Sequence, residues 1–202
     1  LSKRRKFSEN IQRFGRSLLL PIAVMAPVGM VLGLTGALVQ GYMIERVPFL
    51  GNETLQTILV GLRSIADVIF GNIPVLFAMG VAYGVSRKEK GIAVFSSIIS
   101  YLILNATINV WLKATGNLAP AEEMAQVGQG MVLGIQTLRL DVLGGIISGL
   151  LAARMADKYS EKQLPIAFAF FSGIKFVPII TIAATIVVGL IIPFFWQFVT
   201  KG

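Results

Sequence analysis

The sequence contains no cysteine and no histidine among its 202 residues. Without cysteine it cannot form a disulfide framework, and without either residue it lacks the common ligands of soft metals. It also cannot carry a phosphohistidine or a phosphocysteine, and it cannot build a Ser-His or Cys-His catalytic pair. The composition therefore excludes these catalytic groups, and we expect no metal site in this chain.

Charged residues are also scarce, at 14% of the chain against 55% hydrophobic residues. A soluble domain is roughly a quarter charged. The net charge of +8 would attract nucleic acid if the basic residues formed a stripe on a folded surface. They gather instead at the ends of long apolar segments, where basic residues flank membrane spans. The composition predicts an all-α polytopic membrane protein in a lipid bilayer, with no nucleic-acid partner.

Five apolar stretches are long enough to cross a bilayer, since a helix of about 20 residues spans its hydrocarbon core. They cover residues 17–40, 54–86, 91–112, 131–156 and 176–199. The second stretch is broken near Pro74 by the sequence GNIP, and it could cross twice. We prefer one crossing, because two would place the basic run at 87–90 outside the cell.

The loops between these stretches divide by charge. Residues 1–16 and 86–91 carry an excess of lysine and arginine, and 157–163 lean basic together with the preceding Arg154, whereas 41–53 and 113–130 carry no such excess. Basic loops stay in the cytoplasm in most membrane proteins. We therefore expect a cytoplasmic N-terminus, the other two basic loops on the same side, and the remaining two loops outside.

Two short segments are predicted to be amphipathic. Residues 1–16 hold six basic residues, one acid, and apolar residues at helical spacing at positions 7, 11 and 14. This pattern favours a helix on the anionic leaflet, with a solvated basic tail as the alternative. Residues 164–173, LPIAFAFFSG, are too short to cross and precede the last span.

Charges and glycines inside the spans suggest helix contacts. Arg63 and Asp67 are four residues apart in the second span. Intramembrane charges mark functional sites by default, but a structural ion pair or an interfacial position explains these two equally well. Gly145 and Gly149 in the fourth span, like the glycines of the first, would allow close approach of a second helix. We expect these glycine faces to form a contact between two copies of the chain.

Four segments resemble the glucose/maltose-type enzyme IIC of the bacterial phosphoenolpyruvate-dependent sugar phosphotransferase system. They are residues 12–33, 72–105, 133–159 and 164–181. The last contains LPIAFAFFSGIKFVPIIT, which is similar to the family's LP…FF-G-(K/R)-FVPII segment. The likeness extends over nearly all of residues 7–200, and the last two segments occur in the family's order and separation.

The resemblance implies a homodimeric transporter of the bacterial plasma membrane. It would import a hexose or an α-glucoside and release it as the phosphate, with a phosphocysteine on a IIB domain or subunit as donor and no other cofactor. Residues 17–200 would form the N-terminal, dimerisation half. The family's histidine and GITEP-type glutamate loop belong to a second, sugar-binding half and are absent here. We expect the full-length protein to be a sugar phosphotransferase and this segment alone to be inactive. The loop 41–53 favours the maltose side.

Two places in this chain match family segments near the sugar path or its gate. They are Phe14-Gly15-Arg16 and Gly173-Ile174-Lys175-Phe176. Many family members carry two adjacent basic residues at the second place, whereas this chain has Ile174 and then Lys175. A lysine beside a phosphotransfer path would attract the incoming phosphoryl group. The alternative is a lysine whose ammonium group reaches the membrane interface and takes no part in transfer.

Two other function classes remain open at this point. The chain could belong to a secondary transporter or channel that does not use phosphotransfer. It could also be a structural membrane scaffold. Proline breaks and polar helix faces suit a transporter better than a simple anchor, because irregular backbone at membrane depth lines cavities.

The topology is testable by single-cysteine labelling, which is clean in a chain without native cysteine. A cysteine at Lys88 should be shielded from an impermeant thiol reagent added outside intact cells, and it should react after the cells are opened. A cysteine at Glu122 is the control and should react from outside. Labelling at position 88 in intact cells would overturn the proposed orientation.

Overall fold

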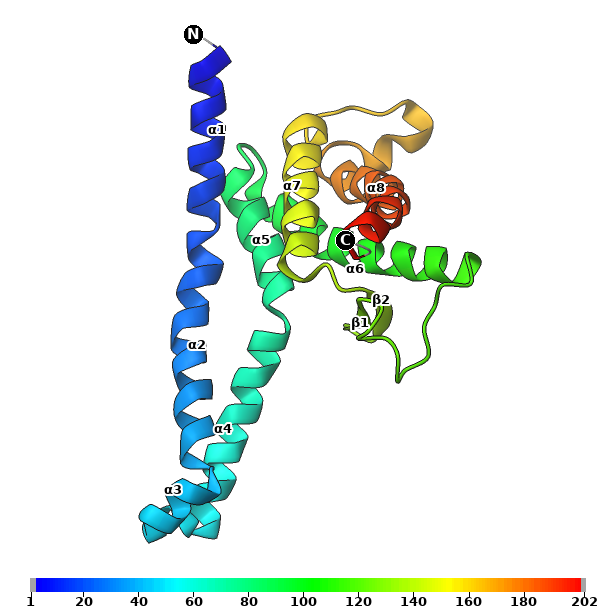
Figure 1. Ribbon diagram of the computed structural model, residues 1–202. Coiled ribbons are helices and arrows are strands. Elements are labelled where there is room, and N and C mark those ends of the chain that lie inside the picture. Colours follow the sequence, from blue (N-terminus) through cyan, green and yellow to red (C-terminus); the bar gives the residue numbers. More distant parts are fainter. Residues whose placement is uncertain (1–2, 201–202) are drawn as a thin grey trace. The chain divides into compact units, whose positions relative to one another are not determined.

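The computed structural model describes residues 3–200, with side chains from residue 5 to residue 196. Residues 1 and 2 of the predicted N-terminal helix, and residues 201 and 202, lie outside this range. The chain forms two compact units (Figure 1). Unit 1 consists of residues 1–18 and 74–202, and unit 2 consists of residues 19–73. Each unit is described by itself.

Most described residues of both units are helical. Unit 1 contains α1 (Lys3–Ser17), α5 (Ile73–Val85), α6 (Lys90–Ala114), β1 (Gln129–Val132), β2 (Ile135–Leu138), α7 (Asp141–Tyr159), the 3-10 turns η2 (Ile166–Phe171) and η3 (Gly173–Lys175), and α8 (Phe176–Thr200). Unit 2 contains α2 (Leu19–Leu38), α3 (Gly41–Arg46), the 3-10 turn η1 (Pro48–Gly51) and α4 (Glu53–Gly71). The all-α membrane class predicted from the sequence is confirmed, with one small β-hairpin added.

Four helical segments among the described residues are long and apolar enough to cross a membrane. They are Arg5–Leu38, Glu53–Gly71, Lys90–Ala114 and Gly173–Trp196, and the shorter helix α5 is also apolar. The predicted second span therefore consists of two helices, α4 and α5, and the predicted break near Pro74 is confirmed. Pro74 lies in the first turn of α5, where a missing backbone N–H breaks no helical hydrogen bond.

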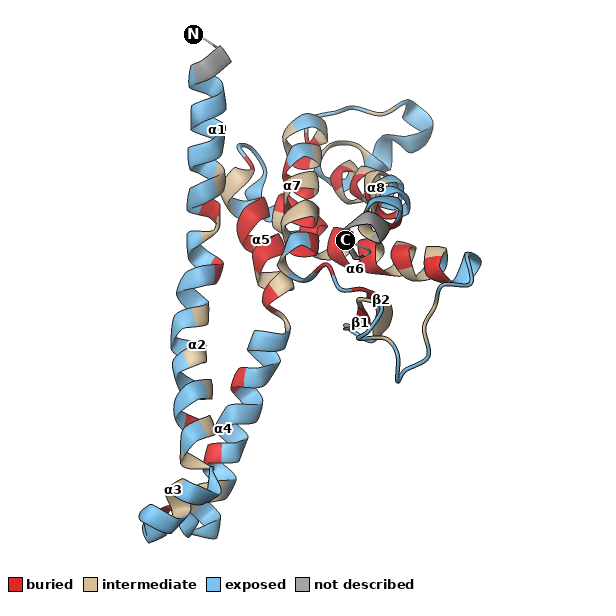
Figure 2. Cartoon of the chain, viewed as in Figure 1, coloured by how far each residue is buried: buried red, intermediate tan, exposed pale blue. Residues whose placement is uncertain are grey.

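Helix α6 is the centre of unit 1, and both α7 and α8 pack against it (Figure 2). Leu104 and Ile108 of α6 are completely buried. Four polar side chains of this helix are also buried, those of Ser96, Ser97, Ser100 and Asn105. The hydroxyls of Ser100 and Thr185 share a 2.8 Å hydrogen bond that links α6 to α8. Polar groups of this kind hold helices together where water is absent.

Helices α5 and α7 approach so closely that their backbones touch. A side chain on Gly145 would collide with the carbonyl oxygen of Pro74, and one on Gly149 would lie 2.6 Å from that of Ala78. In both contacts the residue of α7 is numbered 71 above its partner in α5. A constant difference means that the two helices run parallel and keep the same register along the contact. The expectation that Gly145 and Gly149 contact a second copy of the chain is therefore wrong. They contact α5 of the same chain.

A β-hairpin replaces the first third of the predicted fourth span. Residues 131–138 were expected to be helical, but β1 and β2 pair antiparallel with Val132 opposite Ile135. The two residues between them, Leu133 and Gly134, have φ values of +49° and +80°. Positive φ at both central positions is the requirement of the tight turn that matches strand twist. The helical part of this span begins only at Asp141.

Side-chain amides hold the hairpin to the preceding loop and to α6. Gln129 donates to the carbonyl of Asn117 at 2.7 Å and accepts from the backbone N–H of Ala119 at 3.1 Å. Gln136 donates to the carbonyl of Ala119 at 2.8 Å, and Asn109 donates to the carbonyl of Gln136 at 2.7 Å. These bonds satisfy loop groups that no helix or sheet could pair.

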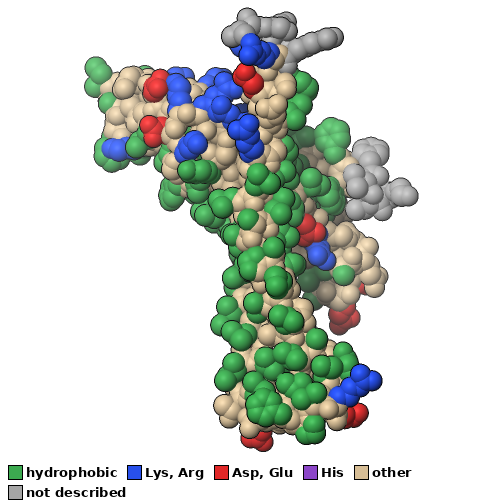
Figure 3. Space-filling view, turned by 90° about the vertical axis from the view of Figure 1, so that its left-hand side faces the viewer, with side chains coloured by type: hydrophobic (Ala, Val, Ile, Leu, Met, Phe, Trp, Pro, Cys, Tyr) green, Lys and Arg blue, Asp and Glu red, His purple; other side chains and the backbone are tan. Residues whose placement is uncertain are grey.

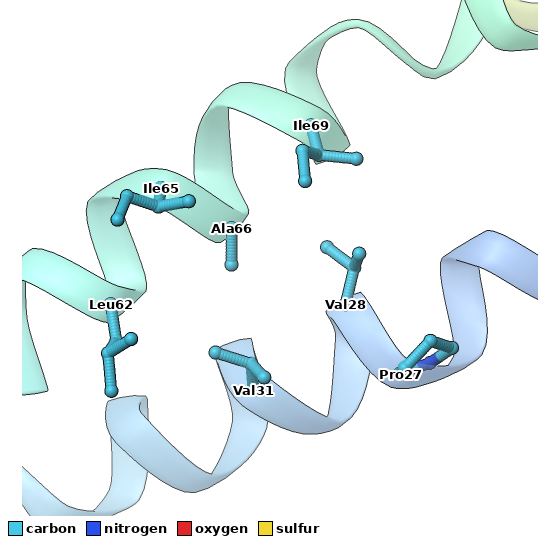
Figure 4. A pocket seen from close by; sticks show the side chains of 7 residues that line it. All are labelled: Pro27, Val28, Val31, Leu62, Ile65, Ala66 and Ile69. Atoms are coloured by element: carbon cyan, nitrogen blue, oxygen red, sulfur yellow. The ribbon is translucent and has the colours of Figure 1, made fainter.

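Unit 2 is a pair of helices, α2 and α4, that leave most of their apolar surface uncovered. Between them lies an apolar cavity of about 230 Å³ (Figure 4). Its lining residues are Pro27, Val28, Val31, Leu62, Ile65, Ala66 and Ile69. Gly29 faces Phe70 of α4, whereas an added side chain on Gly33 would meet nothing within 4 Å. The glycine face of α2 is therefore only partly used inside the unit.

Candidate functional site at the end of helix α7

The segment after α7 is a closed loop that presents Lys175. The backbone N–H of Gly173 donates to the carbonyl of Lys162 at 2.9 Å, and that of Leu164 donates to the hydroxyl of Ser172 at 2.9 Å. Gly173 has a φ of +69°, a conformation that favours glycine. The loop ends in η3, so Lys175 lies directly before α8.

Three lysines gather around aromatic rings in this region. The Lys175 ammonium lies 4.1 Å from the centre of the Phe170 ring. The ammonium groups of Lys158 and Lys162 lie 5.1 and 5.4 Å from the centre of the Tyr159 ring. An ammonium near an aromatic face is held there by the ring's quadrupole. These contacts order the cations without neutralising them.

The predicted site residues Phe176 and Ile174 have different surroundings. Phe176 is half-buried, and its ring meets that of Tyr159 edge to face with centroids 5.9 Å apart. Ile174 is 49% exposed, and Lys175 is exposed as well. The packed ring holds the start of α8 against the end of α7, and the neighbouring Lys175 remains exposed.

The first predicted place, residues 14–16, lies at the end of α1. Phe14 is half-buried, Gly15 and Arg16 are exposed, and the Ser17 hydroxyl donates to the Phe14 carbonyl at 2.6 Å. Ser17 itself is buried against Gly84 of α5, where there is no room for a side chain. Among the described residues, no hydrogen bond, ion pair or ring contact joins residues 14–16 to residues 173–176 directly.

The loop between α5 and α6 contacts the neighbourhood of both predicted places. The Arg87 guanidinium donates to the Asn10 side chain of α1 at 2.6 Å. Lys88 forms a 2.9 Å ion pair with Glu161, just after α7. Figure 3 shows that lysine and arginine side chains gather in one region of this unit. A concentration of basic side chains of this kind attracts anions.

Asp157 is a residue of this region that sequence reasoning missed. Its Oδ1 accepts hydrogen bonds from the Ser86 hydroxyl at 3.1 Å and from the backbone N–H groups of Arg87 and Lys88 at 2.7 and 3.1 Å. A carboxylate in the last turn of a helix faces the negative end of the helix dipole. That unfavourable position was the available signal that Asp157 has a tertiary partner.

The expected ion pair between Arg63 and Asp67 is not formed within 4 Å in the structure. Both side chains are exposed on α4. Across residues 5–196 the ion pairs within this distance are Lys88–Glu161 and Arg139–Asp141. The described residues also contain no group of three or more acidic side chains arranged to hold a metal ion.

Comparison with known proteins agrees with this architecture. A membrane protein with proline-broken apolar helices and a basic cluster at one end has the features of a transporter subunit. The family described as "Phosphotransferase system, EIIC" matches residues 15–202. One curated relative, the maltose-specific EIICB component of the phosphotransferase system from Escherichia coli (strain K12), is 33% identical over 196 residues. The alignment covers 96% of this chain and 37% of that relative. The chain belongs to the phosphotransferase system EIIC family.

Proposed function

We propose that this chain is the N-terminal half of the EIIC subunit of a phosphoenolpyruvate-dependent sugar phosphotransferase transporter. Such a transporter would import a hexose or an α-glucoside of the glucose/maltose class and deliver it as the phosphate. The observation that carries this proposal is the family match over residues 15–202, together with a maltose-specific relative aligned to nearly the whole chain. The proposed location is the bacterial plasma membrane, with the N-terminus in the cytoplasm.

The proposed division of labour follows from the residues that the sequence lacks. A chain without histidine and cysteine cannot carry the phosphoryl group as a phosphohistidine or a phosphocysteine. The donor is therefore proposed to be a phosphocysteine of a IIB domain or subunit, and the sugar is proposed to bind mainly outside residues 1–202. The EIICB name of the relative supports a IIB partner. We propose that this chain instead forms a scaffold and presents the basic cluster of Lys158, Lys162 and Lys175 to the incoming phosphoryl group.

Uptake in cells tests this assignment against a secondary transporter. The full-length protein should support uptake of labelled maltose or glucose only when the phosphorelay is intact, and the sugar should be recovered as its phosphate. Cells whose relay is disrupted should lose uptake. Equal uptake of unmodified sugar with and without the relay would contradict the proposal and favour a transporter driven by an ion gradient.

Within this function, Lys175 is proposed to assist phosphoryl transfer. Its ammonium is exposed, is ordered over Phe170, and forms no ion pair within 4 Å among the described residues. A fixed cation beside the path of a phosphoryl group stabilises the charge that develops during transfer. A lysine that only anchors a helix end at the membrane interface would have no such effect.

Replacing Lys175 by alanine in the full-length transporter should therefore slow sugar phosphorylation more than it weakens sugar binding. The expected loss in kcat is about 100-fold if the ammonium acts in the transition state. Lys175→Arg keeps the charge and should retain more activity, and Lys113→Ala removes an exposed lysine at the end of α6 as a control. Near-normal binding and phosphorylation in Lys175→Ala would remove this residue from the site.

The proposed homodimer would use α2 of unit 2. Its Gly33 is exposed and has open space beside it, and the apolar residues Met30 and Leu34 next to it are 66% and 62% exposed. Large uncovered apolar surface needs lipid or another protein to cover it. A glycine within that surface lets the backbone of a second helix come close.

Gly33→Leu should therefore weaken the dimer in detergent while leaving the melting temperature of the protomer unchanged. Gly149→Leu is the matched comparison, because its side chain would strike α5 of the same chain and should lower the melting temperature. Size-exclusion chromatography with light scattering and thermal unfolding measure the two effects. A dimer that is unaffected by Gly33→Leu would show that this face meets lipid.

A further inference from the structure

The α5–α7 contact ends in a hydrogen-bonded group. Along α7, the small residues Gly145, Gly149 and Ala153 are followed four positions later by Asp157. The facing residues of α5 follow the same spacing and lead to Ser86 at the end of the helix. Ser86 and Asp157 differ by 71 in number, as do the two backbone contacts described above. Asp157 therefore occupies the next position of the same register, beyond the last turn of α5.

Asp157 holds the backbone of the loop that follows α5. One carboxylate oxygen accepts bonds from a hydroxyl and from two successive N–H groups. Hydrogen bonds to an ionised acceptor are about twice as strong as neutral ones. Ser86 is completely buried, so its hydroxyl would lose its bond with little water to replace it, whereas the N–H groups of Arg87 and Lys88 lie in the exposed part of the loop.

The bonds that the side chains of Arg87 and Lys88 make are exposed and weaker. The Lys88–Glu161 pair is exposed, with side chains 45% and 77% accessible. Exposed ion pairs contribute about 0–1 kcal/mol. The Arg87–Asn10 bond is also exposed. These two bonds nevertheless connect the loop to α1 on one side and to the segment after α7 on the other.

We propose that Asp157 is a positioning residue that fixes the α5–α6 loop. Through this loop it also fixes the placement of α1 relative to residues 173–176, which contain Lys175. Without the carboxylate, the two exposed bonds would link α1 and Glu161 through a loop that moves. The Ser17–Gly84 and Tyr159–Phe176 contacts would remain as the other restraints on these two parts. The consequence for transport rests on the proposed function, whereas the consequence for position does not. Asp157 acts through the loop and is not proposed to touch sugar or phosphate.

Spin labels test the position directly in the cysteine-free chain, reconstituted in lipid. Cysteines replace the exposed residues Gln12 of α1 and Gln163 after α7, and double electron–electron resonance measures the distribution of distances between the labels. Asp157→Ala should broaden this distribution. Asp157→Asn keeps an acceptor oxygen and should restore much of the narrow distribution. A control pair at Lys113 and Glu123 should be unaffected in all variants.

An unchanged distribution in Asp157→Ala, or equal broadening in Asp157→Asn, would overturn the proposal. If Asp157→Ala also alters the control pair, Ser86→Ala becomes the deciding variant, since it removes one of the three bonds. It should broaden the 12–163 distribution alone, and no broadening would again overturn the proposal.

The functional consequence is measured in the full-length transporter. Asp157→Ala should lower the rate of sugar phosphorylation about 10-fold, which corresponds to the loss of about one hydrogen bond to a charged group. Sugar binding should change little, and Asp157→Asn should recover most of the rate. A normal rate in Asp157→Ala, despite a broadened distribution, would overturn the functional half of the proposal. Absence of phosphorylation in the unsubstituted protein would instead count against the proposed function.

Discussion

The backbone contact between α5 and α7 is the constraint on which the basic end of unit 1 depends. Glycine at positions 145 and 149 brings the two helices to a distance at which carbonyl oxygens of α5 meet the Cα atoms of α7. Contacts of this type recur where helices pack through small residues, and each adds a weak attraction. The bulk of the effect is geometric. The close backbone contact prevents α5 and α7 from sliding along each other. The contact between Gly149 and Ala78, two helical turns before Asp157 and Ser86, therefore already determines that these two residues lie side by side.

The two units differ in where they place polar and apolar side chains. In unit 1 several polar side chains of α6 are buried. Ser100 pairs with Thr185 of α8, whereas Ser97 and Asn105 donate to backbone carbonyls of α6 itself. Among the described residues, the hydroxyls of the completely buried Ser96 and Ser148 have no hydrogen-bond partner, so the polar groups of this core are not all paired. Unit 2 has few such polar groups and instead exposes apolar side chains around both long helices. A surface of that kind is stable only against lipid or another protein.

Particular residues show which features the sequence could reveal. The break near Pro74, the helix at the N-terminus and the long last helix follow from local rules for proline, periodicity and hydropathy. The β-hairpin did not follow, because its turn places Leu133 at positive φ, where asparagine or aspartate is the usual signal. The partner of Gly145 and Gly149 was misassigned, because a glycine face shows that a helix approaches closely but not which helix. Asp157 was missed because its three donors are far away in the sequence, although its place at the helix end was unfavourable.

The cations near Lys175 have a physical consequence that does not depend on any single residue. Lysines 158, 162 and 175 are held near aromatic rings, and among the described side chains none forms an ion pair within 4 Å. Glu161 and Asp157, the acids closest to them in sequence, bind the α5–α6 loop instead. The carboxylates thus serve to fix the backbone while the ammonium groups stay available. Such an arrangement gives this end of unit 1 a preorganised group of positive charges, which attracts anions.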